Sequence, residues 1–470
     1  MIKFGTDGWR GILAEDFTFD NVRLVARAAG RYVLAQGMAE RGLVVAYDTR
    51  FLSERFAGET AELLAKMGIP VYLTRRPTPT PVAAYAILLY RTAGAVVFTA
   101  SHNPPEYNGF KFIPHYAGPA LPHITAEIEE NIRAILAGKG ETPAGGTGAA
   151  DITGIDPYPD YARHLSSVVD LAAIGRAGLK VVVDPMYGAG AGYLEDVLAG
   201  AGAKVESIHS YRDPLFGGTL PEPTAKSLAE LSGRVAQGGA DLGLALDGDA
   251  DRFGIVDRGG SYVSPNQFLP VLLHHLLAAR GMRGPVARTV ATTHLLDTLA
   301  AASGLEVFET PVGFKYIGQC LLERGAVLGG EESGGLSVRG HVPEKDGILA
   351  GLLAAEVVAV HQKGLFELLG EIHGRFGRAV SERIDVHTSL EEKERVLARL
   401  KTLRPDALAG KKVVRTLTVD GLKLVLEGGA WVLVRPSGTE PLFRVYTEAP
   451  SEEEMAAVQQ DFLKKTGLSV

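Results

Sequence analysis

DLGLALDGDADR, residues 241–252, places a short apolar run directly before three aspartates at alternate positions. Apolar runs of this length that end in a polar turn are typical of buried parallel strands, with functional loops at their carboxyl ends. The same order recurs in LVVAYDTR (43–50), AVVFTASHN (95–103) and LKVVVDPMYGAG (179–190). Amphipathic stretches, such as 194–201, lie between these runs. The repeated strand, loop and helix predict an α/β fold built from several similar units rather than one large sheet.

Changes in pattern along the chain predict four domains. The Gly/Thr/Ala-rich segment 138–154 indicates a surface turn or linker, and DRGG (257–260) indicates a turn before the helical run Phe268–Ala279. Residues 411–449 alternate through turns like an antiparallel meander, and a helical tail follows at 451–465. The expected domains are three α/β domains over 1–150, 151–257 and 258–368 and an α+β domain with an antiparallel sheet over 369–470.

The bulk composition narrows the classes of partner. Hydrophobic residues make up 46% of the chain and charged residues 22%, as in ordinary globular proteins. A net charge of −7 argues against nucleic-acid and membrane-surface partners but leaves room for a locally basic phosphate pocket. The single cysteine, Cys320, excludes internal disulfides. No signal-peptide pattern and no apolar run of ~18 residues is present, so we expect a cytoplasmic protein.

Asp247, Asp249 and Asp251 form the first chemical motif. In a loop or extended segment after a strand, the three carboxylates can converge on one hard divalent cation. An EF-hand is excluded because Arg252 and Arg258 stand where its glycine and glutamate would be. The alternative is a solvated acidic turn, which the apolar residues on both sides disfavour.

Two glycine-containing loops offer groups suited to a sugar phosphate. RPSGTEPLFR (435–444) contains the cations, hydroxyls and flexible backbone that bind a phosphate dianion, in Arg435, Ser437, Gly438, Thr439 and Arg444. GGEESGGL (329–336) could hydrogen-bond vicinal sugar hydroxyls through Glu331, Glu332 and Ser333. Taken alone, the first loop could equally be structural, and the second would more often be an ordinary turn.

TASHNPPEYNGFK (99–111) holds Ser101 in a loop stiffened by two prolines, with Lys111 downstream. The GxSxG elbow of α/β-hydrolases is absent. In an extended loop the side chain of His102 would point away from Ser101, so the sequence supports a direct Ser–His pair only weakly.

In this order, FGTDGWRG (4–11), TASHNP, DGDADR, GEESGG and RPSGTEP resemble the α-D-phosphohexomutase superfamily, the phosphoglucomutases and phosphomannomutases, over essentially the whole chain. The resemblance implies four domains around a central cleft and an intramolecular phosphotransferase. It also implies that Ser101 carries a phosphoryl group, donates it to a sugar monophosphate, and recovers the other phosphate of the resulting bisphosphate.

The resemblance implies roles for individual residues as well. Mg²⁺ would be held by Asp247, Asp249, Asp251 and an oxygen of phosphorylated Ser101. The other catalytic groups would be Arg10 and Arg252, which add positive charge, and Lys111, preferred over His102, which exchanges a proton with the sugar. The distal phosphate would bind Arg435, Ser437, Gly438 and Thr439. The sugar would contact Glu331 and Ser333, with Lys315 and His341 as further sugar or phosphate contacts.

The identity of the sugar depends on the loop sequences. GEESGG followed by EKDG is more similar to glucose 1-phosphate enzymes than to GEMSGH mannose or GEQSGH glucosamine enzymes, although glucosamine mutases share the FGTDG run. We therefore expect a phosphoglucomutase with a hexose 1,6-bisphosphate as activator and intermediate, acting on hexose phosphates as a monomer or homodimer. The alternatives are a phosphomannomutase, a phosphoglucosamine mutase, a metal-dependent sugar phosphatase and a non-catalytic sugar-phosphate sensor.

Overall fold

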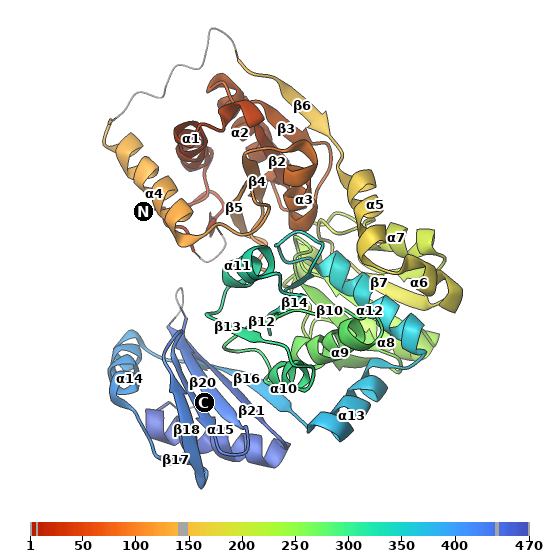
Figure 1. Cartoon of the computed structure of the whole chain (residues 1–470). Coiled ribbons are helices and arrows are strands. Elements are labelled where there is room, and N and C mark those ends of the chain that lie inside the picture. Colours follow the sequence, from red (N-terminus) through yellow and green to blue (C-terminus); the bar gives the residue numbers. More distant parts are fainter. Residues whose placement is uncertain (1, 6–7, 140–148, 438–440, 469–470) are drawn as a thin grey trace. The chain divides into compact units, whose positions relative to one another are not determined.

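The computed structural model describes residues 2–5, 8–139, 149–437 and 441–468 (Figure 1). The chain forms two compact units, which are described separately. Unit 1 comprises Met1–Ser264, Leu321–Glu323 and Ser333–Leu365, and unit 2 comprises Pro265–Cys320, Arg324–Glu332 and Phe366–Val470. The segment Ser333–Leu365 falls within the expected third domain, yet it groups with unit 1.

The first sheet of unit 1 has six strands in the order β1-β5-β4-β2-β3-β6. They are β1 (Trp9–Ile12), β2 (Leu43–Tyr47), β3 (Val71–Thr74), β4 (Gly94–Phe98), β5 (Tyr107–Pro114) and β6 (Ile152–Ile155). β2, β3, β4 and β6 are parallel, whereas β5 is antiparallel to β4 and to β1. β6 lies at the end of the expected linker 138–154. The first sheet therefore includes residues beyond 150, the expected end of the first domain. Its pairing with β3 is a long-range contact that the local composition does not indicate.

Helices pack on both faces of this sheet because successive side chains of a strand point to opposite sides. On β2, Leu43 and Val45 join the core formed with α1 (Phe19–Ala35), α2 (Ser53–Lys66) and α4 (Pro122–Leu136). Val44 and Ala46 pack with α3 (Thr80–Tyr90) on the other face. Burial on both faces explains why the strand is apolar throughout.

The second sheet of unit 1 has the order β11-β10-β9-β7-β8. Its strands are β7 (Lys180–Asp184), β8 (Lys204–Ser207), β9 (Leu242–Leu246), β10 (Phe253–Asp257) and β11 (Ser261–Val263). β7, β8 and β9 are parallel, and β10 returns antiparallel beside β9. α8 (Ala229–Gly238) packs on one face, and α12 (Gly347–His361) packs against β9, β10, α6 (Leu171–Ala177) and α7 (Leu194–Ala201). The loop that joins β9 to β10 is the acidic stretch.

Unit 2 contains a parallel sheet and an antiparallel sheet. In the first, β12 (Val286–Thr289) lies between β13 (Val307–Thr310) and β14 (Leu328–Gly330). The same unit contains α9 (Pro265–Ala278), α10 (Leu295–Ala302) and all of α11 (Phe314–Arg324) except Leu321–Glu323. The second has the order β16-β21-β20-β19-β18-β17. Its elements are β16 (Val380–His387), α14 (Leu390–Thr402), β17 (Ala407–Leu408), β18 (Lys411–Leu417), β19 (Leu422–Leu426), β20 (Trp431–Pro436), β21 (Leu442–Ala449) and α15 (Glu452–Thr466). The expected fold class, with α/β sheets followed by an antiparallel C-terminal sheet, is confirmed.

Among the described residues, no single helix is long and apolar enough to cross a membrane. Two consecutive helices with a bend between them, Gly347–His361 and Leu365–Phe376, together have the length and the apolar composition of a membrane span.

Candidate active site

The loop after β9 brings three carboxylates together. Asp247, Asp249 and Asp251 are each 0% exposed, and one oxygen from each lies within 4.8 Å of the others. Ala250 has a φ of 58°, which turns the backbone between the last two aspartates. A Cβ on Gly248 would lie 2.5 Å from the carbonyl oxygen of Ser101. The acidic loop and the serine loop can therefore approach this closely only because residue 248 is glycine.

Cations lie directly against two of the carboxylates. Lys111 Nζ lies 3.2 Å from Asp249 Oδ2 and 3.1 Å from Asp251 Oδ2, and Lys345 Nζ lies 2.9 Å from Asp251 Oδ2. Thr80, at the start of α3, donates a hydrogen bond of 2.6 Å to Asp249 Oδ2. These contacts leave Asp249 Oδ1 and Asp251 Oδ1 buried without a hydrogen-bond partner.

The pKa values of the outer two aspartates shift in opposite directions. Burial, together with repulsion from Asp249 and Asp251, raises the pKa of Asp247 well above its usual value. Burial also acts to raise the pKa of Asp251, but Lys345 and Lys111 outweigh it and hold that pKa far below the usual value. Three buried oxygen ligands, two of them with an unsatisfied oxygen, fit a hard divalent cation.

Ser101 follows β4, which ends at Phe98, and points at the acidic loop. Its Oγ donates a 2.7 Å hydrogen bond to Asp247 Oδ2, and its φ is 51°. His102 Nδ1 lies 3.3 Å from Ser101 Oγ, so the expectation that His102 points away was wrong. The reason is the left-handed backbone at Ser101, which bends the loop and turns neighbouring side chains toward each other.

Two arginines and His102 complete this cluster of unit 1. Arg252 donates its backbone N–H to Asp247 Oδ1 at 3.0 Å, and its guanidinium pairs with Glu222 at 3.2 Å. Arg10 donates to Asn103 Oδ1 in the serine loop. Burial, reinforced by the charges of Arg252 and Arg10, holds the pKa of His102 well below its usual value. The imidazole is therefore neutral near pH 7.

Comparison with known proteins identifies the family to which this chain belongs. The family described as phosphoglucomutase/phosphomannomutase matches in four parts, as alpha/beta/alpha domain I over residues 1–139, domain II over 159–260, domain III over 264–376 and the C-terminal domain over 388–465. The chain belongs to the phosphoglucomutase/phosphomannomutase family. The resemblance seen in the sequence is confirmed, and the protein is an enzyme, an intramolecular phosphotransferase of the phosphohexomutase type.

Relatives within this family differ in the sugar for which they are named. The chain is 32% identical over 451 residues to a phosphoglucomutase/phosphomannomutase of Thermococcus kodakarensis, covering 96% of this chain and 95% of the relative. It is 34% identical over 457 residues to a phosphoglucosamine mutase of Carboxydothermus hydrogenoformans, covering 95% and 94%. A crystal structure from Thermus thermophilus, named as a phosphomannomutase, matches with a TM-score of 0.85 at 34% identity over 98% of each chain.

The expected sugar-contact residues of this phosphohexomutase lie in both units. In unit 2, Glu331 is 4% exposed and accepts a 3.0 Å hydrogen bond from the backbone of Gly313, just before α11. Lys315 lies in the first turn of α11 and is partly exposed. In unit 1, Ser333 is partly exposed.

His341, a further expected contact, lies in unit 1. Its side chain is fully buried, its Nε2 lies 2.7 Å from Asp346 Oδ2, and its Nδ1 lies 3.0 Å from His164 Nε2. Tyr161 donates a 2.6 Å hydrogen bond to the same oxygen of Asp346, whose other oxygen caps the N-terminus of α12. Both ring nitrogens of His341 have partners, so in this structure the side chain joins α5 (Tyr158–Val168) to the start of α12, and its contact with the substrate stays a prediction.

The expected phosphate anchor lies at the end of β20. Arg435 lies opposite Arg444 on β21, and its Nε and Nη2 are each 2.9 Å from Asp420 Oδ2. Lys393 donates a 2.7 Å hydrogen bond to the carbonyl of Ser437. Gly438 and Thr439, the other two anchor residues expected from the sequence, lie outside the described residues.

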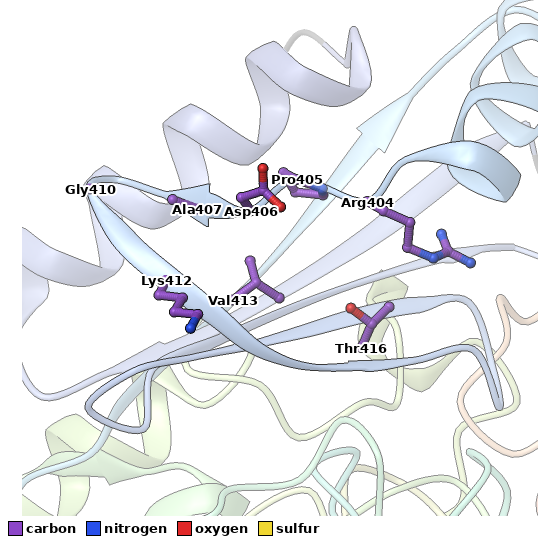
Figure 2. A pocket seen from close by; sticks show the side chains of 8 residues that line it. All are labelled: Arg404, Pro405, Asp406, Ala407, Gly410, Lys412, Val413 and Thr416. Atoms are coloured by element: carbon purple, nitrogen blue, oxygen red, sulfur yellow. The ribbon is translucent and has the colours of Figure 1, made fainter.

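Sequence reasoning missed three contacts of these sites. Lys345 lies in the EKDG run, four residues after His341, and its charge two residues before a helix could have suggested a site residue. Thr80 and Asp420 carry no local signal. The C-terminal sheet also has a hollow of about 590 Å³ beside β17 and β18, lined by Arg404, Pro405, Asp406, Ala407, Gly410, Lys412, Val413 and Thr416 (Figure 2). It contains none of the expected site residues.

Proposed function

We propose that this phosphohexomutase interconverts glucose 1-phosphate and glucose 6-phosphate through a phosphoserine at Ser101 and a glucose 1,6-bisphosphate intermediate. The observation that carries the proposal is the 2.7 Å hydrogen bond from Ser101 Oγ to a buried cluster of three aspartates. A hydroxyl aimed at carboxylates would accept no phosphoryl group without compensating positive charge, and Lys111, Lys345 and Arg252 lie in the same cluster. We also propose the four-domain division at residues 150, 257 and 368.

The acidic loop is proposed to hold Mg²⁺ through Asp247, Asp249 and Asp251. The unsatisfied oxygens of two of these aspartates suit a hard cation. When bound, Mg²⁺ supplies positive charge beside the phosphoryl group. Thr80 and Lys111 hold Asp249 in place through its other oxygen.

The residues around Ser101 divide the remaining work. His102 is neutral and its Nδ1 lies 3.3 Å from Ser101 Oγ, which suits it to accept the Ser101 proton when the hydroxyl attacks a bisphosphate and to return that proton when the phosphoryl group leaves the serine. Lys111 lies between two carboxylates, where its charge offsets theirs, and it is proposed, in preference to His102, to exchange a proton with the sugar. Arg10 and Arg252 are proposed to add positive charge around the transferring phosphoryl group.

Further residues are proposed to bind the distal phosphate and the sugar. Arg435, Ser437, Gly438 and Thr439 are proposed to bind the distal phosphate, and Asp420 supports this role because it fixes the orientation of the Arg435 guanidinium. Glu331, Lys315 and Ser333 are proposed to contact the sugar. The preference for glucose rests on the GEESGG and EKDG sequences, and mannose or glucosamine phosphates are the alternatives.

A substrate panel tests the assignment. Purified enzyme with Mg²⁺ and a trace of glucose 1,6-bisphosphate is given the 1-phosphates of glucose, mannose and glucosamine, and the 6-phosphate and inorganic phosphate are both measured. We expect the highest kcat/KM for glucose 1-phosphate, with mannose 1-phosphate lower by about 1–3 kcal/mol because the two differ at one hydroxyl. A clear preference for glucosamine 1-phosphate would contradict the glucose assignment, and release of inorganic phosphate at the isomerisation rate would contradict mutase activity itself.

A further inference from the structure

Arg50, in the turn after β2, is fully buried beneath the serine loop. Its guanidinium donates four hydrogen bonds to backbone carbonyls of that loop. Nη2 donates to Ser101 at 2.6 Å and to Asn103 at 2.7 Å, and Nη1 donates to Pro104 at 2.8 Å and to Tyr107 at 3.0 Å. One side chain therefore binds the main chain of the loop from the reactive serine to the start of β5.

The guanidinium is itself held from several sides. Its Nε lies 3.3 Å from Asp48 Oδ2, and the other oxygen of Asp48 accepts hydrogen bonds from Ser53 and from the backbone of Arg50. The ring of Phe216 lies under the guanidinium, 4.9 Å away, and is fully buried. Arg212 donates to the backbone carbonyl of Arg50 at 3.3 Å. Arg50 is thus fixed before any substrate binds.

The serine loop needs such a fixed partner for two reasons. A φ of 51° at Ser101 is unfavourable for a residue with a Cβ, so other contacts must hold it there. The carbonyl of Ser101 is also the atom that approaches Gly248 of the acidic loop. The bond from Arg50 to this carbonyl therefore sets both the direction of Ser101 Oγ and the separation of the two loops.

We propose that Arg50 is the positioning residue of the reactive serine, a role that rests on the proposed function of Ser101. Its guanidinium holds the left-handed backbone that aims Oγ at Asp247, and its charge lies behind the loop when Ser101 carries a phosphate. Lysine cannot replace it, because the three N–H donors of an ammonium group start from one nitrogen, whereas the planar guanidinium reaches four carbonyls from two separate nitrogens. Arg50 touches no reacting atom.

Arg50→Lys and Arg50→Ala test this role. We expect kcat for hexose-phosphate isomerisation to fall about tenfold to a hundredfold in Arg50→Lys and further in Arg50→Ala, with KM within about threefold of wild type, because the residues proposed to bind sugar and distal phosphate are unchanged. The rate at which glucose 1,6-bisphosphate phosphorylates Ser101, followed by intact mass, should fall in parallel. Millimolar guanidinium should restore Arg50→Ala at least fivefold, and urea at the same concentration should not.

Arg288→Lys is the matched control. Arg288 is equally inaccessible, at 2% exposure, but its guanidinium pairs with Asp297 and Glu309 in unit 2. This variant should lose thermal stability while kcat stays within about twofold of wild type. The control separates the loss of a buried arginine from the loss of this particular contact with the serine loop.

Several results would overturn the role of Arg50. A kcat of Arg50→Lys within twofold of wild type would do so. So would a decrease in the activity of Arg50→Ala that is explained by its smaller fraction of folded protein and is not restored by guanidinium. If Arg50→Ala does not fold, Arg50→Lys decides. If wild-type enzyme isomerises no hexose phosphate, the proposed function fails, but the rate of Ser101 phosphorylation still tests Arg50. Absence of phosphorylation at Ser101 would overturn both.

Discussion

Replacing Asp247 with asparagine is expected to stabilise the metal-free protein while removing its response to Mg²⁺. At an effective dielectric constant of about 20, two charges 4.8 Å apart repel by about 3.5 kcal/mol, and Asp247 faces two such neighbours. Lys111 and Lys345 offset part of the charge of Asp249 and Asp251. The side-chain oxygen of asparagine can still accept a hydrogen bond from Ser101 Oγ or from the backbone N–H of Arg252. We therefore expect a net gain of about 2 kcal/mol in the free energy of unfolding.

The sign of the pH dependence follows from the raised pKa of Asp247. The folded protein holds this proton more tightly than the unfolded chain, so the stability that the proton contributes is present at low pH and is lost as pH rises through the folded pKa. The advantage of Asp247→Asn should therefore grow with pH, and pH 8 is a suitable condition for the comparison.

Urea unfolding in EDTA and in Mg²⁺ measures both effects. A cation at a hundred times its Kd should stabilise wild type by about 2.7 kcal/mol, and the variant by less than about 1 kcal/mol. Asp297→Asn is the control, because it removes a carboxylate paired with buried Arg288 and should destabilise the protein. The reasoning is refuted if Asp247→Asn is less stable than wild type in EDTA or gains as much from Mg²⁺.

Three further predictions concern other contacts. Arg435→Ala should reduce kcat/KM for hexose phosphates by about 2–5 kcal/mol, through loss of a charged phosphate contact, without changing Mg²⁺ affinity; unchanged kinetics would place the anchor elsewhere. Ser101→Ala should abolish isomerisation and the phosphoryl mass gained from glucose 1,6-bisphosphate, while hexose-phosphate binding by calorimetry persists; an active alanine variant would contradict the phosphoserine. Burial, followed by the neighbouring His341, lowers the pKa of His164 to about 4, so the folded protein binds fewer protons than the unfolded chain between pH 6.5 and 4. As pH falls through this window, the free energy of unfolding should decrease by on the order of 1 kcal/mol. In urea unfolding at pH 7 and pH 5, His164→Gln should show a smaller decrease than wild type.

Local pattern was sufficient for much of the fold. The helix expected at 194–201 is α7, the apolar run before the acidic loop is β9, and the alternating stretch 411–449 forms β18 to β21. In each case the signal is the periodic burial of neighbouring side chains, which the sequence shows directly. Residue types also indicated the metal site, because three alternate aspartates after a strand can converge on one hard cation. The phosphoryl chemistry of Ser101 followed from the resemblance to the family and not from the residue types of its loop.

Long-range contacts decided the rest. The pairing of β6 with β3, the grouping of Ser333–Leu365 with unit 1 and the burial of His341 between His164 and Asp346 all join segments far apart in the chain. No local pattern specifies such contacts, since they depend on which surfaces meet after the elements form. The left-handed backbone at Ser101 is the clearest case. Its sequence permits an extended loop that separates Ser101 from His102, and only the tertiary contacts of the loop, the four hydrogen bonds from Arg50 among them, bring the two side chains together.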